Sequence, residues 1–344
     1  MIASPSFIGV DLAWGEGTNE KSANETGLVE IDETGNVLDA GWARGIEAVV
    51  DWLTTHAKPS TLIAIDAPLV VPNATGMRTC EREVGQRYGR WKVSANATNL
   101  GRGWQAGMAL GVRLEQVGYQ YWSGADDRDP AAVSFFECYP FTTLVGAWEF
   151  GYDVERPRYK RTVTSMTPSD RRAFRARECD ELIRRFAGFR DVQPPLDLLS
   201  HPATRSLVDE PSPLTDVQYK HREDLLDAAI AAWTAALWDR FGSERCQVLG
   251  ANSELDNDGR RATIIAPMRP EQASRASTRR TVRKSPMTPR SFNQAAFRHV
   301  VLSAVQRIEL VEASGAARSI PVTGGELHLA LSDDGTVLSL QVKP

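Results

Sequence analysis

The sequence predicts an α/β fold, in which one large domain is built on a central sheet and is followed by a small C-terminal appendage. Three observations predict it. Short apolar runs typical of buried strands recur through the first 140 residues. An apolar stripe at helical spacing extends over residues 219–240, and Gly242 stands where that helix should end. The length of 344 residues is sufficient for one large core with an appendage.

The chain is expected to open with an antiparallel meander. Residues 7–14 are apolar except for Asp11, and glycines follow them, which is typical of a buried strand and a turn. Further short strands are expected at 27–31 and 37–43. Apolar residues at helical spacing then predict a helix over 46–53.

Two later strands also end in a carboxylate. The apolar run 62–69 carries Asp66 just before Ala-Pro, and the run 133–140 carries Glu137 shortly before a proline. An unpaired buried carboxylate costs several kcal/mol, so such groups must be hydrogen-bonded, ion-paired or bound to cations. Strands are also expected at 247–250 and 262–267.

The long helix carries polar groups on one side of its first turns. Asp224 and Asp227 lie three residues apart and share a face, with His221 one turn earlier. Small residues at 228–232 would let this helix approach a sheet closely enough for Asp227 to reach the strand carboxylates. Oxygen ligands select hard cations, which favours Mg²⁺ or Mn²⁺ in phosphoryl transfer by two ions about 4 Å apart.

Four motifs in this order resemble a known family. The segments GVDLA, IDAPL, ECYPF and HREDLLDAAIAAW are similar to those of the bacterial and archaeal family called domain of unknown function 429, regarded as predicted nucleases of the ribonuclease H fold. The resemblance covers residues 6–267. It implies a ribonuclease H-like mixed five-stranded sheet, with the first three strands antiparallel, the first strand central and helices on both faces.

The resemblance also implies a site. In that superfamily a catalytic aspartate stands on the first strand, an acid ends the fourth strand, and further ligands stand on a late helix, as in RuvC-like resolvases. The acid on the first helix of ribonuclease H proper has no match here, so the RuvC-like arrangement fits better. Glu137 has no counterpart among the usual ligands. The expected catalytic residues are Asp11, Asp66, Glu137, His221, Asp224 and Asp227, and the expected metal ligands are Asp11, Asp66, Asp224 and Asp227.

These acids also have purely structural interpretations. Asp224 could pair with Lys220 or Arg222 on its own helix. Glu137 could be the buried partner of one of the arginines at 78–90. The strand-end acids could accept backbone hydrogen bonds or form turns.

The modest net charge of −4 conceals an uneven distribution. Basic residues exceed acids by three at 77–92, by seven at 156–190 and by six at 268–290. Such patches suit phosphate contacts, although a solvated helix face explains 156–190 equally well. The expected substrate-binding residues are Arg78, Arg82, Lys92 and Lys160, and the aromatic residues expected to stack on bases are Tyr88, Trp91 and Trp104.

Three segments organise the chain. Residues 1–267 form the ribonuclease H-like domain with a helical insertion around 151–215. A basic linker follows at 268–290, and 291–344 form a small α+β extension with a helix near 292–303. The four cysteines form no CxxC pair, and no run of eighteen apolar residues occurs, so we expect a cytoplasmic protein without membrane spans.

These features predict a Mg²⁺- or Mn²⁺-dependent nuclease that acts on nucleic acid. One alternative is an inactive nucleic-acid-binding or regulatory module of the same fold. Another is a phosphotransferase or ATPase of the actin and sugar-kinase type, which the absence of a glycine-rich phosphate turn after Asp66 disfavours.

Overall fold

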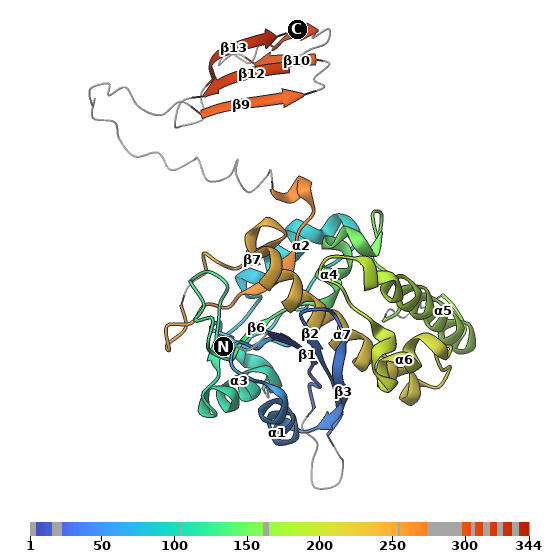
Figure 1. The fold of residues 1–344 in the computed structure, drawn as a ribbon. Helices are drawn as coiled ribbons and strands as arrows, with labels where there is room; N and C mark the ends of the chain where they lie inside the picture. Colours follow the sequence, from blue (N-terminus) through green and yellow to red (C-terminus); the bar gives the residue numbers. More distant parts are fainter. Residues whose placement is uncertain are drawn as a thin grey trace. The chain divides into compact units, whose positions relative to one another are not determined.

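The computed structural model describes residues 5–15, 23–103, 105–160, 165–253 and 255–273, and the backbone of five strands between 298 and 343. The chain divides into two compact units, Met1–Thr281 and Val282–Pro344 (Figure 1). Over the described ranges, none of the helices has the length and apolar character needed to cross a membrane.

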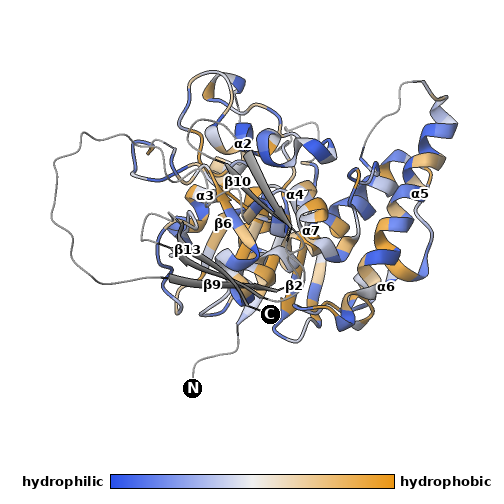
Figure 2. Cartoon of the chain, turned by 90° about the horizontal axis from the view of Figure 1, so that it is seen from above, coloured by the Kyte–Doolittle hydropathy of each residue, from blue (hydrophilic) through white to orange (hydrophobic). Residues whose placement is uncertain are grey.

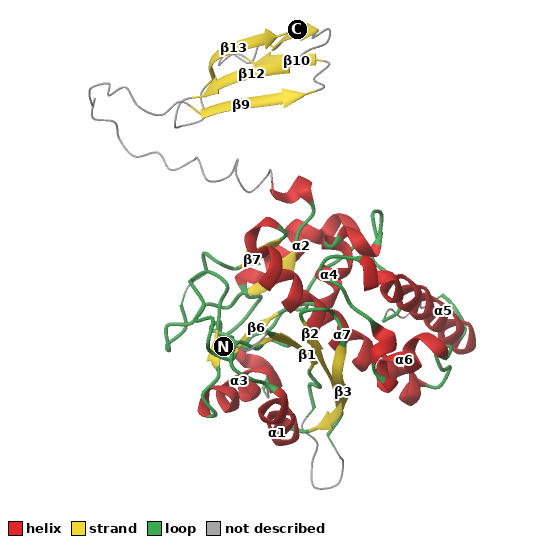
Figure 3. Ribbon diagram, viewed as in Figure 1, coloured by secondary structure: helices red, strands yellow, loops and turns green. Residues whose placement is uncertain are grey.

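A mixed six-stranded sheet forms the centre of the first unit (Figure 3). Its strand order is β3-β2-β1-β4-β6-β5. The antiparallel members are β1 (Ser6–Asp11), β2 (Glu25–Asp32) and β3 (Val37–Arg44), and the parallel members are β4 (Leu62–Asp66), β6 (Ser134–Glu137) and β5 (Gln120–Tyr121). The expected antiparallel opening is confirmed. The expected count of five strands is wrong, because the two-residue edge strand β5 is too short to leave an alternating pattern in the sequence.

Helices cover both faces of this sheet. Helix α7 (Asp216–Phe241) packs across β1, β2 and β4. On the opposite face α1 (Ile46–His56) packs against α3 (Ala106–Gln116), and α3 lies against Phe135 of β6. In Figure 2 the hydrophobic colour gathers around β6 and α7, in the middle of the unit. The long core helix expected at 219–240 is therefore confirmed.

The remaining elements of the first unit surround this centre. The stretch around 151–215, expected to be a helical insertion, contains α5 (Pro168–Phe186) and α6 (Pro202–Asp209) among its described residues, and a separate antiparallel hairpin follows α7. The other elements are α2 (Thr79–Tyr88), α4 (Pro140–Gly146), β7 (Cys246–Leu249) and β8 (Ile264–Pro267). Short 3₁₀ turns lie at Gly89–Trp91, Leu100–Arg102, Trp148–Phe150, Ala187–Asp191, Leu198–Ser200 and Gly242–Glu244.

In the second unit, expected to be a small α+β extension, the described residues are strands. Residues 298–303 form a strand where a helix was expected, consistent with the β-branched pair Val300 and Val301; residues 292–297 lie outside the described part. The strands are β9 (Arg298–Ser303), β10 (Arg307–Val311), β11 (Ala317–Pro321), β12 (Glu326–Leu331) and β13 (Val337–Lys343). They pair as a three-stranded sheet, β13-β12-β9, and a two-stranded sheet, β10-β11.

The segment expected to be a basic linker begins within the first unit. Arg269 is buried and donates hydrogen bonds to the Val145 carbonyl at 2.7 Å and to Asp153 at 2.8 Å. The first residues of this segment therefore pack on the first unit, and residues 274–290 lie outside the described part.

Two glycines allow α7 to lie unusually close to the sheet. A Cβ atom on Gly9 would lie 1.9 Å from the carbonyl oxygen of Ala228, and one on Gly27 would lie 2.1 Å from that of Asp224. Real Cβ atoms do not approach other atoms so closely, so any larger residue must push the helix away. The glycines on β1 and β2 thus fix the distance between the sheet and the first half of α7.

Gly9→Ala is therefore expected to lower the free energy of unfolding by about 1–3 kcal/mol, because its methyl group overlaps the backbone of α7. Gly41→Ala in β3 is the matched control, since nothing lies within 4 Å of its added carbon. Urea denaturation followed by circular dichroism measures both. Equal stability of the two variants would contradict the close approach.

Candidate functional site

Asp11 and Asp66 lie side by side at the carboxyl ends of two neighbouring strands. They are direct register partners in the parallel pair of β1 and β4. Asp11 is also the register partner of Gly27 in β2, above which the backbone of Asp224 lies. Register partners point to the same face of a sheet, so both strand carboxylates face α7.

Helix α7 brings two further acids to the strand carboxylates. Asp224 is 2% exposed, and it lies close enough to Asp11 for the charge of Asp11 to raise its pKa. Asp227 is fully buried, and its Oδ1 accepts a hydrogen bond of 2.6 Å from the hydroxyl of Tyr159. The structure thus brings together four of the expected residues, Asp11, Asp66, Asp224 and Asp227, a group that we call the acid cluster.

Two lysines supply positive charge within the acid cluster. The Lys220 ammonium lies 2.5 Å from Asp224 Oδ1, 3.1 Å from Glu223 Oε1 and 4.0 Å from Asp11 Oδ2. The Lys160 ammonium pairs with Asp227 Oδ2. Lys160 was expected to bind substrate, and Lys220 was considered only as a partner of Asp224 on the same helix. Carboxylates and ammonium groups therefore alternate around the cluster.

Burial makes three of these carboxyl groups weaker acids than usual. It raises the pKa of Asp66 well above the ordinary value, and it raises that of Asp224 to about 9 and that of Asp227 to about 6. The charge of Asp11 raises all three pKa values further, whereas the lysines lower them. The carboxylates in turn raise the pKa of Lys160 well above its usual range. The two lysines thus offset the cost of burying these carboxylates only in part.

A cavity of about 530 Å³ gives access to this cluster from outside. Its polar lining includes Asp11, Asp66, Asp224, Lys160, Lys220 and His221. Two exposed apolar side chains, Trp14 and Val217, also line it, with 55% and 83% of their surfaces accessible. Asp227 is not among the lining residues and lies behind the others.

His221 stands in the wall of this cavity in a fixed orientation. Its Nδ1 lies 2.7 Å from Glu25 Oε2, and its ring stacks on Trp42 with 3.7 Å between centroids. Arg44 holds Glu25 from the other side at 2.8 Å. Glu25 therefore engages one ring nitrogen, which leaves Nε2 as the nitrogen available to a ligand. Sequence reasoning found His221 but missed Glu25, which lies 196 residues away in the chain.

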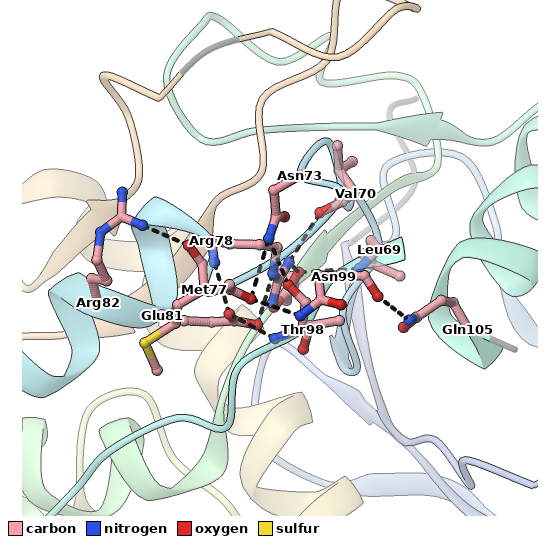
Figure 4. Close-up of polar contacts among 12 residues, drawn as sticks. Leu69, Val70, Asn73, Met77, Arg78, Glu81, Arg82, Thr98, Asn99 and Gln105 are labelled. Carbon is pink, nitrogen blue, oxygen red and sulfur yellow. Dashed lines mark hydrogen bonds and ion pairs between the residues drawn. The ribbon is translucent and has the colours of Figure 1, made fainter. Parts of the chain in front are cut away.

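Glu137 does not join the acid cluster. It is the register partner of Ile65, not of Asp66, so its side chain points to the opposite face. There both of its oxygens accept hydrogen bonds from Arg78, at 2.6 and 2.7 Å. Arg78 also donates to Glu81 at 2.8 Å, and Figure 4 shows how this network ties Glu81 to Thr98.

The basic residues expected to bind substrate also have other partners. Arg78 is 3% exposed and engaged by Glu137 and Glu81, so it presents no surface to a phosphate. Arg82 donates to the Met77 carbonyl (Figure 4) and to the Thr79 hydroxyl, and Lys92 pairs with Glu155 at 2.8 Å. Only Lys160 of the four lines the cavity of the acid cluster.

Two of the aromatic residues expected to stack on bases are buried in the core. Tyr88 and Trp91 have no exposed surface. The Tyr88 hydroxyl donates to the Pro267 carbonyl, and the Trp91 indole donates to the Asp153 carbonyl. The expectation was therefore wrong for both. Trp104 lies outside the described residues. An exposed indole at the cavity is instead supplied by Trp14.

The acid cluster matches a hard cation in donor chemistry but is not arranged as a finished metal centre. Asp11 Oδ2 is buried and accepts no hydrogen bond from any residue that the structure describes, so it has a lone pair to offer. Within the part of the chain that the structure describes, however, no three His, Cys, Asp or Glu side chains are grouped so that they could hold an ion. Because Lys160 and Lys220 contact the carboxylate oxygens, binding of a cation requires these ammonium groups to move.

Comparison with known proteins returns one family. A family model described as "Protein of unknown function (DUF429)" matches residues 9–255, which include every member of the acid cluster. No curated protein and no solved structure matches the chain.

Arg78→Met is expected to lower the free energy of unfolding by about 3–5 kcal/mol, because it leaves two buried carboxylates without their partner. Arg113→Met is the control, since its pair with Glu47 is exposed to solvent and should contribute little to stability. Chemical denaturation of both variants measures the difference. A loss of similar size in the two would show that the buried network does not organise the fold.

The raised pKa of Asp224 predicts a pH dependence of stability. Between about pH 4 and its folded pKa of about 9, the folded state binds a proton that the unfolded chain releases, so the free energy of unfolding falls as pH rises. Asp224→Asn removes the titrating carboxyl group and with it this decrease in the free energy of unfolding. We expect the variant to be more stable than the wild type at pH 8, by an amount on the order of 1 kcal/mol, and the advantage to shrink at pH 5.

Asp216→Asn provides the contrast in the same helix. Hydrogen bonds from Arg172 and Arg175 lower the pKa of Asp216, so its removal should bring no gain in stability at pH 8. Urea denaturation at the two pH values measures both variants. A pH-independent difference for Asp224→Asn would refute the assignment of a raised pKa.

Proposed function

The chain belongs to the DUF429 family of proteins of unknown function, and we propose that it is a divalent-metal-dependent nuclease that hydrolyses phosphodiester bonds in nucleic acid. The observation that carries this proposal is the convergence of Asp11, Asp66 and Asp224 on one accessible cavity, with Asp227 behind them. Buried carboxylates with raised pKa values concentrate at functional sites, where a ligand supplies the missing charge.

In this proposal the cavity-lining carboxylates of the acid cluster hold Mg²⁺ or Mn²⁺. Support comes from the all-oxygen donor set and from Asp11 Oδ2, which accepts no hydrogen bond from the described residues. When bound, such ions lower the pKa of a water and stabilise the leaving oxygen of the diester. Asp227, held by Tyr159 and Lys160, would add negative charge behind the ligands.

The other residues of the cavity have roles of their own in this proposal. Lys160 and Lys220, once they leave the carboxylates, would contact the phosphate group of the substrate. His221 would exchange a proton at Nε2, because Glu25 holds its other nitrogen. Its ring is fixed against Trp42, which favours one orientation toward the cavity.

We further propose that the sheet is of the ribonuclease H-like type with a RuvC-like set of carboxylates. Three antiparallel strands are followed by a parallel one, and acids lie on the first strand, on the fourth strand and in a late helix. These features support the proposal. A cytoplasmic location is proposed as well, because all four cysteines are free thiols.

One observation favours a second candidate function. Lys160 and Lys220 already neutralise part of the acid cluster without a metal ion. A module that keeps the fold and binds nucleic acid without cleaving it would have this property. Its binding would fall with rising salt and would not depend on Mg²⁺.

Asp11→Asn is expected to reduce metal-dependent cleavage by roughly 100-fold or more, because it removes a carboxylate from the ion site, while the protein stays folded. The assay incubates the full chain with single-stranded, duplex, hybrid and branched nucleic acids in Mg²⁺, Mn²⁺ or EDTA. Asp51→Asn, an exposed aspartate on α1, is the control. Cleavage that survives in EDTA or in Asp11→Asn refutes the metal-dependent mechanism, and salt-sensitive binding without cleavage favours the second candidate.

A further inference from the structure

Trp14 occupies a position that the proposed chemistry does not use. It lies three residues after Asp11, and 55% of its surface is exposed. It lines the cavity of the acid cluster and also a smaller recess of about 80 Å³. Among the described residues, Asp66 and Trp14 line both hollows. The recess therefore adjoins the cavity of the acid cluster at these two residues.

The recess suits a flat molecule with polar edges. Apolar surface comes from Trp14 and Pro68, and Tyr139 adds an aromatic ring whose hydroxyl is bound to the Ser94 carbonyl at 3.1 Å. The exposed amide of Asn96 offers both a donor and an acceptor. Such a combination of an aromatic face and amide edge is what a nucleobase requires.

The recess also has a rigid wall. Arg78, Glu81 and Glu137 line it, and these are the residues joined in the buried ionic network, of which Figure 4 labels Arg78 and Glu81. Glu81 further accepts a hydrogen bond of 3.0 Å from the backbone of Thr98, which lines the recess as well. Because the network fixes these segments, the recess is already formed before any ligand enters.

We propose that Trp14 stacks on a nucleobase that enters this recess, so that the substrate is single-stranded or locally unpaired nucleic acid. The inference rests on the proposed nuclease function and names its substrate class. A base in a duplex has both faces covered by neighbours and its pairing edge occupied. It can present a face to Trp14 and an edge to Asn96 only after it leaves the stack. A phosphate at the acid cluster and a base in the recess then belong to adjacent parts of one strand.

The test compares binding by wild type, Trp14→Ala and Trp14→Phe. Fluorescence anisotropy is measured with a labelled single-stranded oligonucleotide and with the matching duplex, in Ca²⁺ and at fixed salt. Trp14→Ala should weaken single-strand binding by roughly tenfold, whereas Trp14→Phe, which keeps an aromatic face, should retain most of it. Duplex binding should be weak and insensitive to both changes. Trp148→Ala is the control, because that exposed indole stacks on Arg245 and lines neither hollow.

A cleavage series with Mg²⁺ separates this inference from the nuclease proposal. One base at a time is removed from the single strand, leaving the backbone intact. Wild type should lose roughly tenfold in kcat/KM at one position, and Trp14→Ala should be insensitive at that same position. Cleavage that does not depend on Trp14, or an equal loss on duplex, overturns the inference and leaves the nuclease standing. Absence of both cleavage and binding in wild type overturns the nuclease proposal and this inference together.

Discussion

The close contact between α7 and the sheet determines the rest of the site. Gly9 and Gly27 let the helix backbone lie where side chains would normally stand between a helix and a sheet. Every residue from Arg222 to Leu237 is buried, because α4, α5 and α6 also contact the helix, so its carboxyl groups in this stretch have little contact with water. The same contact that stabilises the core by burying apolar surface therefore places two acids against two others.

Such an arrangement costs stability, and the chain offsets that cost only in part. Lys160 and Lys220 approach the carboxylates, yet the pKa values of Asp66, Asp224 and Asp227 remain above their usual range. Evolution tolerates unfavourable burial of charge where a ligand relieves it. The acid cluster therefore has the electrostatic character of a binding site. Buried carboxylates whose charge is fully compensated by ion pairs would only stabilise the fold.

Much of this fold followed from periodicity, and the site followed in part. Strands and the long helix were predictable because apolar runs and helical spacing are local properties. The approach of Asp11 to Asp66 was predictable because parallel strands end at the same edge. Glu137 was misplaced because its strand pairs one residue out of step, with Ile65 opposite it, and a one-residue difference exchanges the faces of a sheet. Lys160 was expected at the substrate and not on Asp227, because the loop that carries it meets α7 only through tertiary contacts.

The two sides of these strand ends carry ionic groups of opposite character. On one face each of the three guanidinium nitrogens of Arg78 donates to an acceptor, in Glu137, Glu81 or the Val70 carbonyl. On the other face Asp11 Oδ2 is buried, and none of the described residues donates a hydrogen bond to it. A saturated network has nothing left to offer a ligand and holds the backbone segments around it in place. The acid cluster is unsaturated and open to a cavity. Trp14 and Asp66 lie where this cavity meets the recess that the Arg78 network lines. The Arg78 network thus fixes the shape of the recess beside the acid cluster, because the recess and the acid cluster share the ends of β1 and β4.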